Sequence, residues 1–111
     1  MNIKNIEEIL KKISDDRNWD KFHSPKNLSM ALSVESSELV EIFQWLTEEE
    51  SKNLSDDNLQ KVKDEIGDIT TYLIRLCMKL NINLEEATLE KIEKSTKRYT
   101  IEKSKNNANK Q

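Results

Sequence analysis

The sequence predicts an all-α protein, and three observations support this fold class. One glycine and one proline in 111 residues leave too little turn chemistry for a sheet of β-hairpins. Apolar residues recur every three or four positions along most of the chain, which is the spacing of amphipathic helices. Hydrophobic and charged residues each make up 35% of the chain, so each helix has a narrow apolar face and a wide polar one. We therefore expect the core to be completed against further subunits.

The first two helices are separated by a loop. Isoleucine and leucine recur at helical spacing over residues 3–16, which predicts the first helix. The segment 17–25 has no such period, carries two aromatic residues and ends in the single proline, so it is expected to be a loop. Pro25 or Lys26 then opens a second helix, whose apolar stripe continues to residues 45–46.

Side-chain caps predict where the remaining helices begin. Thr47 starts a capping-box pattern in a short turn, and Ser55 can cap a long third helix that continues to Leu80. Asn83 has the position of a cap for a fourth helix. Gly67 lies inside the third helix, where glycine is unfavourable, and close approach of a neighbouring helix is the simplest explanation.

Composition also predicts how the chain is divided into domains and which kinds of partner it is unsuited to bind. Residues 1–100 are expected to form one domain, and the polar, aperiodic segment 101–111 a disordered tail. A net charge of −3 offers no basic field for nucleic acid, and no apolar run exceeds three residues, far below a membrane span. The start of the chain lacks the pattern of a secretory signal, and Cys77 is the only cysteine, so a cytoplasmic protein is expected.

Four carboxylates stand close to the apolar faces of two helices. Glu35 falls inside the apolar stripe of the second helix and Glu38 at its edge, whereas Glu65 and Asp68 share one flank of the third helix. Burying an unpaired carboxylate is costly, and the second helix has no basic residue after Lys26 to compensate. A divalent cation is the better candidate, because hard cations such as Mg²⁺ prefer oxygen ligands.

Two other interpretations of these carboxylates remain open. Acidic residues three apart on a helix are usually solvated surface. A di-iron bundle also uses carboxylates, but it needs a Glu-x-x-His motif on each of two helices, and the only histidine, His23, lies in the predicted loop. Among metals, the pattern therefore favours Mg²⁺, with Mn²⁺ as a substitute, over iron or zinc.

The same residues carry a resemblance to a known family. Glu35-Ser36-Ser37-Glu38 followed by Glu65-Ile66-Gly67-Asp68 resembles the paired ExxE and ExxD motifs of the MazG-like all-α nucleoside triphosphate (NTP) pyrophosphohydrolases. Segments 17–28, 43–45, 68–73 and 97–99 resemble, in the same order, the dCTP pyrophosphatase branch of that family. The resemblance covers about residues 3–99. The ExxE and ExxD motifs alone are weakly specific, whereas the whole ordered set is strongly specific.

The resemblance implies a fold and a reaction. It implies a four-helix MazG-like bundle, completed as a homodimer or homotetramer. It also implies a Mg²⁺ cluster held by Glu35, Glu38, Glu65 and Asp68 that grips a nucleoside triphosphate, with Glu35 or Glu38 orienting the attacking water. The products would be a nucleoside monophosphate and diphosphate. The expected substrates are dCTP or related non-canonical pyrimidine deoxynucleotides, removed as a house-cleaning function. The alternative is a non-catalytic helical oligomerisation or nucleotide-sensing module, in which the carboxylates would be dispensable.

Seven further residues are candidates for substrate binding. Aromatic rings can stack on a base or close over the sugar, and cations can contact phosphates, although core packing and helix-end electrostatics explain such residues equally simply. Where this chain has serine 95, the dCTP-selective branch has asparagine, which puts base selectivity in doubt. The candidates are Trp19, His23, Trp45, Tyr72, Lys91, Ser95 and Arg98.

Overall fold

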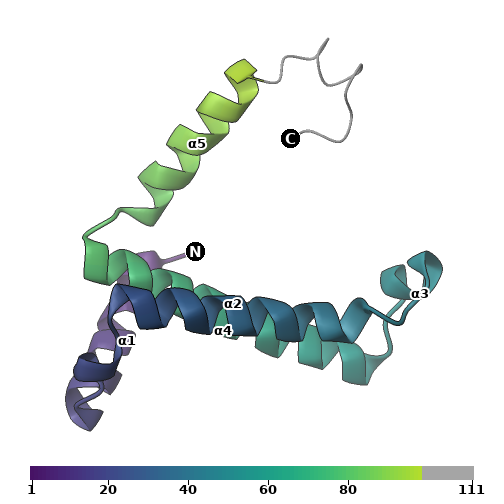
Figure 1. Cartoon of the computed structure of the whole chain (residues 1–111), viewed down its shortest axis with the longest axis horizontal. Helices are drawn as coiled ribbons and strands as arrows, with labels where there is room; N and C mark the ends of the chain where they lie inside the picture. The colour runs from purple at the N-terminus through teal and green to yellow at the C-terminus, as the bar shows by residue number, and fades with distance from the viewer. Residues whose placement is uncertain (99–111) are drawn as a thin grey trace. The chain divides into compact units, whose positions relative to one another are not determined.

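The computed structural model describes residues 1–98, and every regular element in that range is helical (Figure 1). The all-α prediction is confirmed, and the predicted tail 101–111 lies outside the described residues. Residues Met1–Asn81 form one compact unit, and a second begins at Ile82. The predicted 1–100 domain stays a prediction. In chain order the elements are α1 (Ile3–Arg17), the 3₁₀ turn η1 (Asp20–Phe22), α2 (Pro25–Phe43), α3 (Glu48–Lys52), α4 (Asp56–Leu80) and α5 (Leu84–Arg98).

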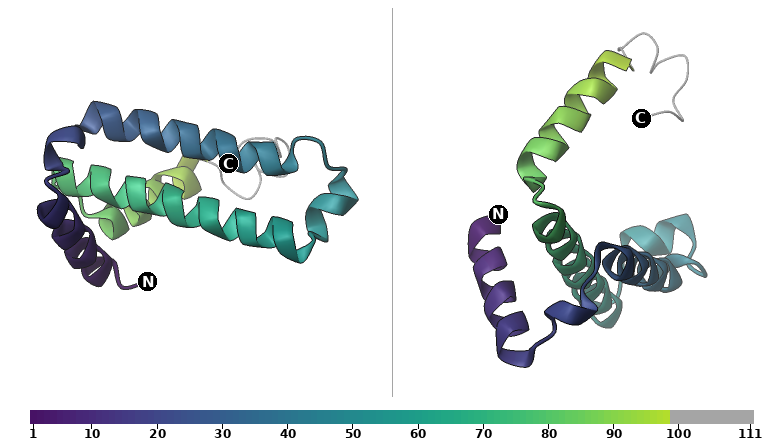
Figure 2. Two further views of the ribbon diagram at one scale, coloured as in Figure 1. Left: turned by 90° about the horizontal axis from the view of Figure 1, so that it is seen from below. Right: turned by 60° about the vertical axis from the view of Figure 1, so that its left-hand side comes forward.

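The centre of the first unit is an antiparallel pair formed by α2 and α4. The two helices run side by side, and α3 lies in the connection at one end (Figure 2, left). Leu28 of α2 and Ile74 of α4 are each only 1% exposed, and Leu10 and Cys77 complete the small apolar core. Complete burial of a leucine or isoleucine side chain contributes about 1.5–3 kcal/mol, so the pair holds the first unit together.

The predicted helix starts are confirmed by their caps. Ser24, Thr47, Ser55 and Asn83 each accept a hydrogen bond from the backbone N–H three residues on, at 3.0–3.2 Å. In α3 the capping box is complete, because Glu50 Oε1 also accepts from the Thr47 N–H at 2.9 Å. The expected turn after α2 is therefore a five-residue helix.

Two details differ from the sequence-based expectations. The second helix ends at Phe43 rather than at residues 45–46, because the chain turns there and then extends into the cap of α3. Gly67 is not explained by close approach of another helix within the described residues, since nothing outside its own helix backbone and chain neighbours lies within 4 Å of the position a Cβ would take. Within one chain, that expectation was wrong.

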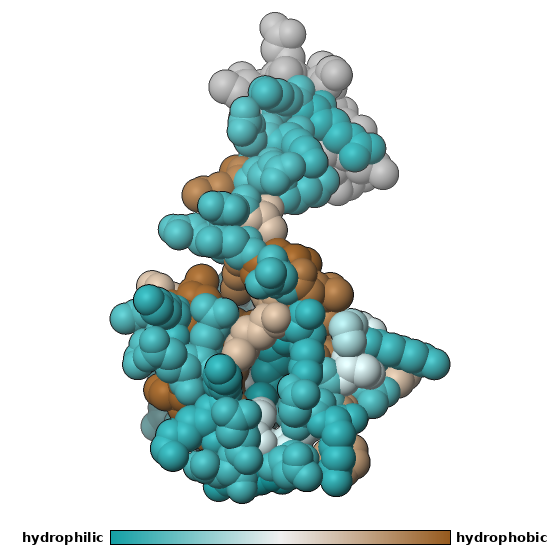
Figure 3. Space-filling view, turned by 90° about the vertical axis from the view of Figure 1, so that its left-hand side faces the viewer, coloured by the Kyte–Doolittle hydropathy of each residue, from teal (hydrophilic) through white to brown (hydrophobic). Residues whose placement is uncertain are grey.

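Apolar side chains on α2 and α4 remain exposed in the single chain. Val34, Val40 and Ile66 are each more than half exposed, and Trp45 is 86% exposed. The face in Figure 3 is mostly hydrophilic, with hydrophobic residues gathered in separate patches. No helix within residues 1–98 is both long and apolar enough to span a bilayer.

We expect the protein to form at least a homodimer, because a second copy can bury these apolar side chains. Light scattering at micromolar concentration should report a mass at least twice the 13.0 kDa of one chain. Val34→Lys should shift the protein toward monomer, whereas Lys12→Gln, on the exposed polar surface, should not. A wild-type protein that is monomeric at this concentration would contradict the expectation.

Candidate metal centre

Helices α2 and α4 bring three of the four predicted carboxylates together. Glu35 and Glu38 lie one turn apart on α2 and therefore share one face of that helix. Glu65 of α4 lies opposite this face. One carboxylate oxygen of each residue lies within 4.8 Å of the other two. All three side chains are half-buried. The helix pair thus concentrates negative charge at one point of its interface.

Two oxygens of this cluster are buried without a hydrogen-bond donor. Glu35 Oε2 and Glu65 Oε2 are shielded from solvent, and neither has a partner within residues 1–98. The ion pairs found in that range use other carboxylates. A buried carboxylate oxygen without a donor is unfavourable, so the three residues form a donor set suited to a hard cation.

Repulsion between the carboxylates of the cluster raises the pKa values of Glu35 and Glu65. The pKa of Glu35 is raised from 4.5 to about 7, first by the hydrogen bond its protonated form makes with Glu65, then by burial and by Glu38 and Asp68. For Glu65 the bond from Glu35 lowers the pKa, but burial, Glu38 and Asp68 outweigh it and the net shift is upward. Without a metal, the pair therefore holds a proton more tightly than two separate carboxylates would, because the shared proton relieves their repulsion.

Asp68 lies at the edge of the cluster. Asp68 is exposed and lies one helical turn after Glu65 on α4. It does not belong to the group of Glu35, Glu38 and Glu65, whose carboxylate oxygens lie close together. Its charge nevertheless raises the pKa values of Glu35 and Glu65, so it is near enough to act on both. Its role as a fourth ligand stays a prediction.

An open cavity of about 410 Å³ adjoins the cluster, and it includes residues that sequence reasoning missed. Asn58 and Lys61 precede Glu65 by seven and four residues, so all three share one face of α4. That helical spacing is the signal that would have identified them. The lining residues are Glu38, Glu41, Ile42, Asn58, Lys61 and Glu65.

The two tryptophans lie at opposite ends of α2. Trp19 precedes η1, and Trp45 follows the last turn of the helix. The 19 residues of α2 span about 28 Å, so one chain cannot place both rings on the same base. If both contact one nucleotide, they come from different subunits.

The remaining candidates fall into three places. Tyr72 is half-buried on α4, one turn beyond Asp68. His23 ends η1 and meets the Trp19 ring edge-on, with centroids 6.2 Å apart, at the end of the helix pair away from α3. The other three lie on α5 in the second unit, where their contacts with substrate stay predictions: Lys91, Ser95 and Arg98.

The fold and the cluster together define a class: all-α proteins with an acidic centre between two antiparallel helices. A family model described as the MazG-like family matches residues 30–111. The chain belongs to the MazG-like family.

Individual relatives agree with this assignment. dCTP pyrophosphatase 1 of Bos taurus is 32% identical over 108 residues, which are 96% of this chain and 64% of that protein. The Homo sapiens protein of the same name is 31% identical over 99 residues, 87% of this chain and 58% of its own length. The chain thus spans less than two thirds of these relatives. The crystal structure of a pyrophosphatase from Archaeoglobus fulgidus superposes with a TM-score of 0.85 at 37% identity, covering 90% of this chain and 94% of the other.

Proposed function

We propose that this protein is a Mg²⁺-dependent nucleoside triphosphate pyrophosphohydrolase that acts in the cytoplasm. The observation that carries the proposal is the cluster of Glu35, Glu38 and Glu65, in which two buried carboxylate oxygens find no hydrogen-bond donor among residues 1–98. The names of the relatives, pyrophosphatase and dCTP pyrophosphatase 1, support the same reaction class. Neither nucleic acid nor a membrane is a proposed partner.

The cluster would hold the metal through Glu35, Glu38 and Glu65, with Asp68 as the fourth carboxylate. Mg²⁺ fits because all donors are carboxylate oxygens and no histidine or cysteine takes part, and Mn²⁺ would substitute. When bound, the metal supplies charge neutralisation for the phosphates and lowers the pKa of water.

The chain's own residues would bind the phosphates and orient the water. The triphosphate would lie in the cavity beside the cluster, where the Lys61 ammonium offsets its charge and the Asn58 amide can donate to a phosphate oxygen. Glu35 or Glu38 would accept a hydrogen bond from the attacking water and orient it toward phosphorus. Bond cleavage between the α and β phosphates would release a nucleoside monophosphate and diphosphate.

The direct test is release of diphosphate from a panel of nucleotides with Mg²⁺ present and absent. We expect metal-dependent release from at least one pyrimidine deoxynucleoside triphosphate. No release from any nucleotide would refute the catalytic proposal. It would leave the alternative of a helical oligomerisation or nucleotide-sensing module.

The preferred substrate is proposed to be dCTP or a related pyrimidine deoxynucleotide. Trp19 and Trp45, contributed by different subunits, would stack on the base, and stacking discriminates little because every base has a π face. Discrimination then depends on polar groups at the base edge. Ser95 would present one short hydroxyl to the base, whereas an asparagine would present both a donor and an acceptor.

Ser95→Asn is therefore expected to sharpen selectivity for dCTP. Comparing kcat/KM for dCTP, dTTP, dUTP and dATP in the wild type and the variant measures the effect. We expect the preference for dCTP over dTTP to rise severalfold, since one hydrogen bond is worth about 0.5–1.5 kcal/mol. Thr96→Asn, at the next position on α5, is the matched control. Purine preference in the wild type, or unchanged selectivity in the variant, would contradict the account.

A further inference from the structure

A second cavity, separate from the acidic cluster, lies where α1, the loop around η1 and the end of α4 meet. Its volume is about 290 Å³, near the lower end of the range for small-molecule sites. Arg75, one of its lining residues, lies ten residues and about 15 Å beyond Glu65 along α4. The lining residues are Lys11, Ser14, Asp15, Asp20, His23, Arg75, Met78 and Lys79.

The unusual member of this cavity is Arg75, a buried cation that forms no ion pair within the described residues. Only 9% of the residue is exposed. Within residues 1–98 its one hydrogen bond joins Nη1 to Ser14 Oγ at 2.6 Å, and no carboxylate of that range pairs with it. A guanidinium has five N–H donors, so most of its donor capacity is unused. A buried charge in this state is strongly unfavourable unless a partner compensates it.

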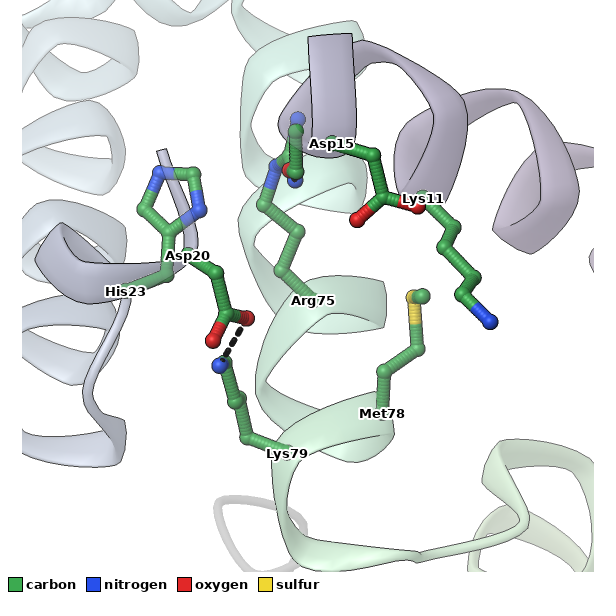
Figure 4. A pocket seen from close by; sticks show the side chains of 8 residues that line it. Lys11, Asp15, Asp20, His23, Arg75, Met78 and Lys79 are labelled. Atoms are coloured by element: carbon green, nitrogen blue, oxygen red, sulfur yellow. Dashed lines mark hydrogen bonds and ion pairs between the residues drawn. The ribbon is translucent and has the colours of Figure 1, made fainter. Parts of the chain in front are cut away.

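The other charges of the cavity leave a positive surplus. Lys79 forms an ion pair with Asp20, drawn as a dashed line in Figure 4. Lys11 and Asp15, both on α1, balance each other in formal charge, which leaves Arg75 as the excess cation. In Figure 4, His23 and Asp20 come from the loop, Lys11 and Asp15 from α1, and Arg75 from α4.

We propose that this cavity binds a small phosphate-type oxyanion, with Arg75 as its principal ligand and Lys11 and His23 as supporting contacts. The planar fork of a guanidinium matches two oxygens of a phosphate, and such charge-assisted bonds are the strongest that a side chain makes. Ser14 Oγ accepts one hydrogen bond from the guanidinium, which leaves the remaining donors for the anion. The site needs no metal and does not depend on the proposed hydrolysis.

His23 supplies a readout of binding, because it is the only histidine in the chain. Its pKa is lowered from 6.5 by burial and by the positive charges of Arg75 and Lys79, which outweigh the opposite effect of Asp20. An anion bound on Arg75 would offset those positive charges and raise the His23 pKa. The Hε1 resonance of this one imidazole in a proton NMR spectrum follows the titration directly.

The experiment uses the full chain freed of metal on a chelating resin, so that no chelator anion competes. Sodium phosphate and then diphosphate are titrated at low ionic strength, with sodium chloride at matched ionic strength as the reference. We expect a saturable shift of the His23 resonance and a higher His23 pKa in phosphate than in chloride. The absence of both, for both anions, would overturn the proposal.

Three variants locate the site. Arg75→Met should weaken binding about tenfold or more, since it removes charge-assisted hydrogen bonds. Lys11 is exposed, so Lys11→Gln should fold normally, and it should weaken phosphate binding severalfold. This variant tests the site if Arg75→Met does not fold. Lys12→Gln, the neighbouring cation paired with Asp16 outside the cavity, should bind like the wild type. Equal weakening by Lys11→Gln and Lys12→Gln would show only diffuse surface attraction and overturn the site.

A fourth variant separates this proposal from the proposed function. Glu38→Gln alters the acidic cluster but not this cavity, so phosphate should bind to it as to the wild type. If the protein hydrolyses no nucleotide yet binds phosphate through Arg75, the proposed function fails and the anion site stands. If Glu38→Gln binds phosphate more tightly than the wild type, the anion lies beside the acidic cluster, whose repulsion this variant relieves, and the proposal fails.

Discussion

Replacing Glu65 by glutamine is expected to lower the turnover of nucleotide about 100-fold or more, because the metal it would help to hold stabilises the transition state by several kcal/mol. Glu65 is the residue of α4 whose carboxylate meets both glutamates of α2. An amide of the same shape keeps the helix packing but removes the negative charge. Steady-state release of diphosphate with Mg²⁺ measures the effect.

The matched control is Asp64→Asn, one position earlier on α4. Asp64 Oδ1 accepts a hydrogen bond from Gln60 at 3.0 Å, and the residue is exposed and outside the cluster. Turnover in this variant should stay within about twofold of the wild type, as expected of a surface substitution. Glu65→Gln with full activity, or wild-type activity unaffected by removal of metal, would remove the basis for a metal centre.

The second large effect concerns stability. Without metal, Glu35→Gln is expected to raise the melting temperature at pH 8 by several degrees, since about 1 kcal/mol shifts the midpoint of a domain this size by about 4–8 °C. The folded pKa of Glu35, about 7, lies above its ordinary value of 4.5. Its proton therefore stabilises the folded protein fully below pH 4.5, and this contribution is lost as the pH rises through 7. Glutamine stays neutral throughout.

Thermal unfolding followed by circular dichroism at pH 5 and pH 8 tests this. The difference between Glu35→Gln and the wild type should be small at pH 5 and large at pH 8. Mg²⁺ at pH 8 should stabilise the wild type more than the variant, because a ligand that binds only the folded state stabilises it. Glu41→Gln removes an exposed carboxylate of the same helix and should leave the pH dependence unchanged. A wild-type melting temperature that is equal at both pH values without metal would contradict the prediction.

Helix periodicity and caps predicted the fold well because both signals are local. The caps at Thr47, Ser55 and Asn83 each act within one turn, so the sequence alone locates them, whereas the structure was needed to identify Ser24 as the cap of α2. The inward phase of Glu35 likewise predicted its burial. The expected ends of the first and the long helix, near Asp16 and at Leu80, agree to within one residue with the ends of α1 and α4, where asparagines 18 and 81 take the left-handed conformation that glycine usually supplies.

Features that depend on tertiary geometry could not be derived from spacing. The hydrogen bond between Arg75 and Ser14 joins residues 61 positions apart, and no local pattern indicates it. Arg75 is nevertheless visible in the sequence as a cation beside the core residues Ile74 and Cys77 of α4. The opposite placement of Trp19 and Trp45 about α2 follows from the predicted helix, because one tryptophan precedes it and the other lies at its end.

The way α1 is attached to α4 has a consequence for the order of folding. Ser14 of α1 bonds to Arg75 of α4, and Asp20 of the following turn η1 bonds to Lys79 of α4. Each of these contacts closes a loop of about sixty residues. The pairing of α2 with α4 closes a much shorter connection through α3. Loop-closure entropy therefore favours an early hairpin of α2 and α4, onto which α1 docks last. In native-state hydrogen exchange, the amides of α1 should then lose protection before those at the centre of α4.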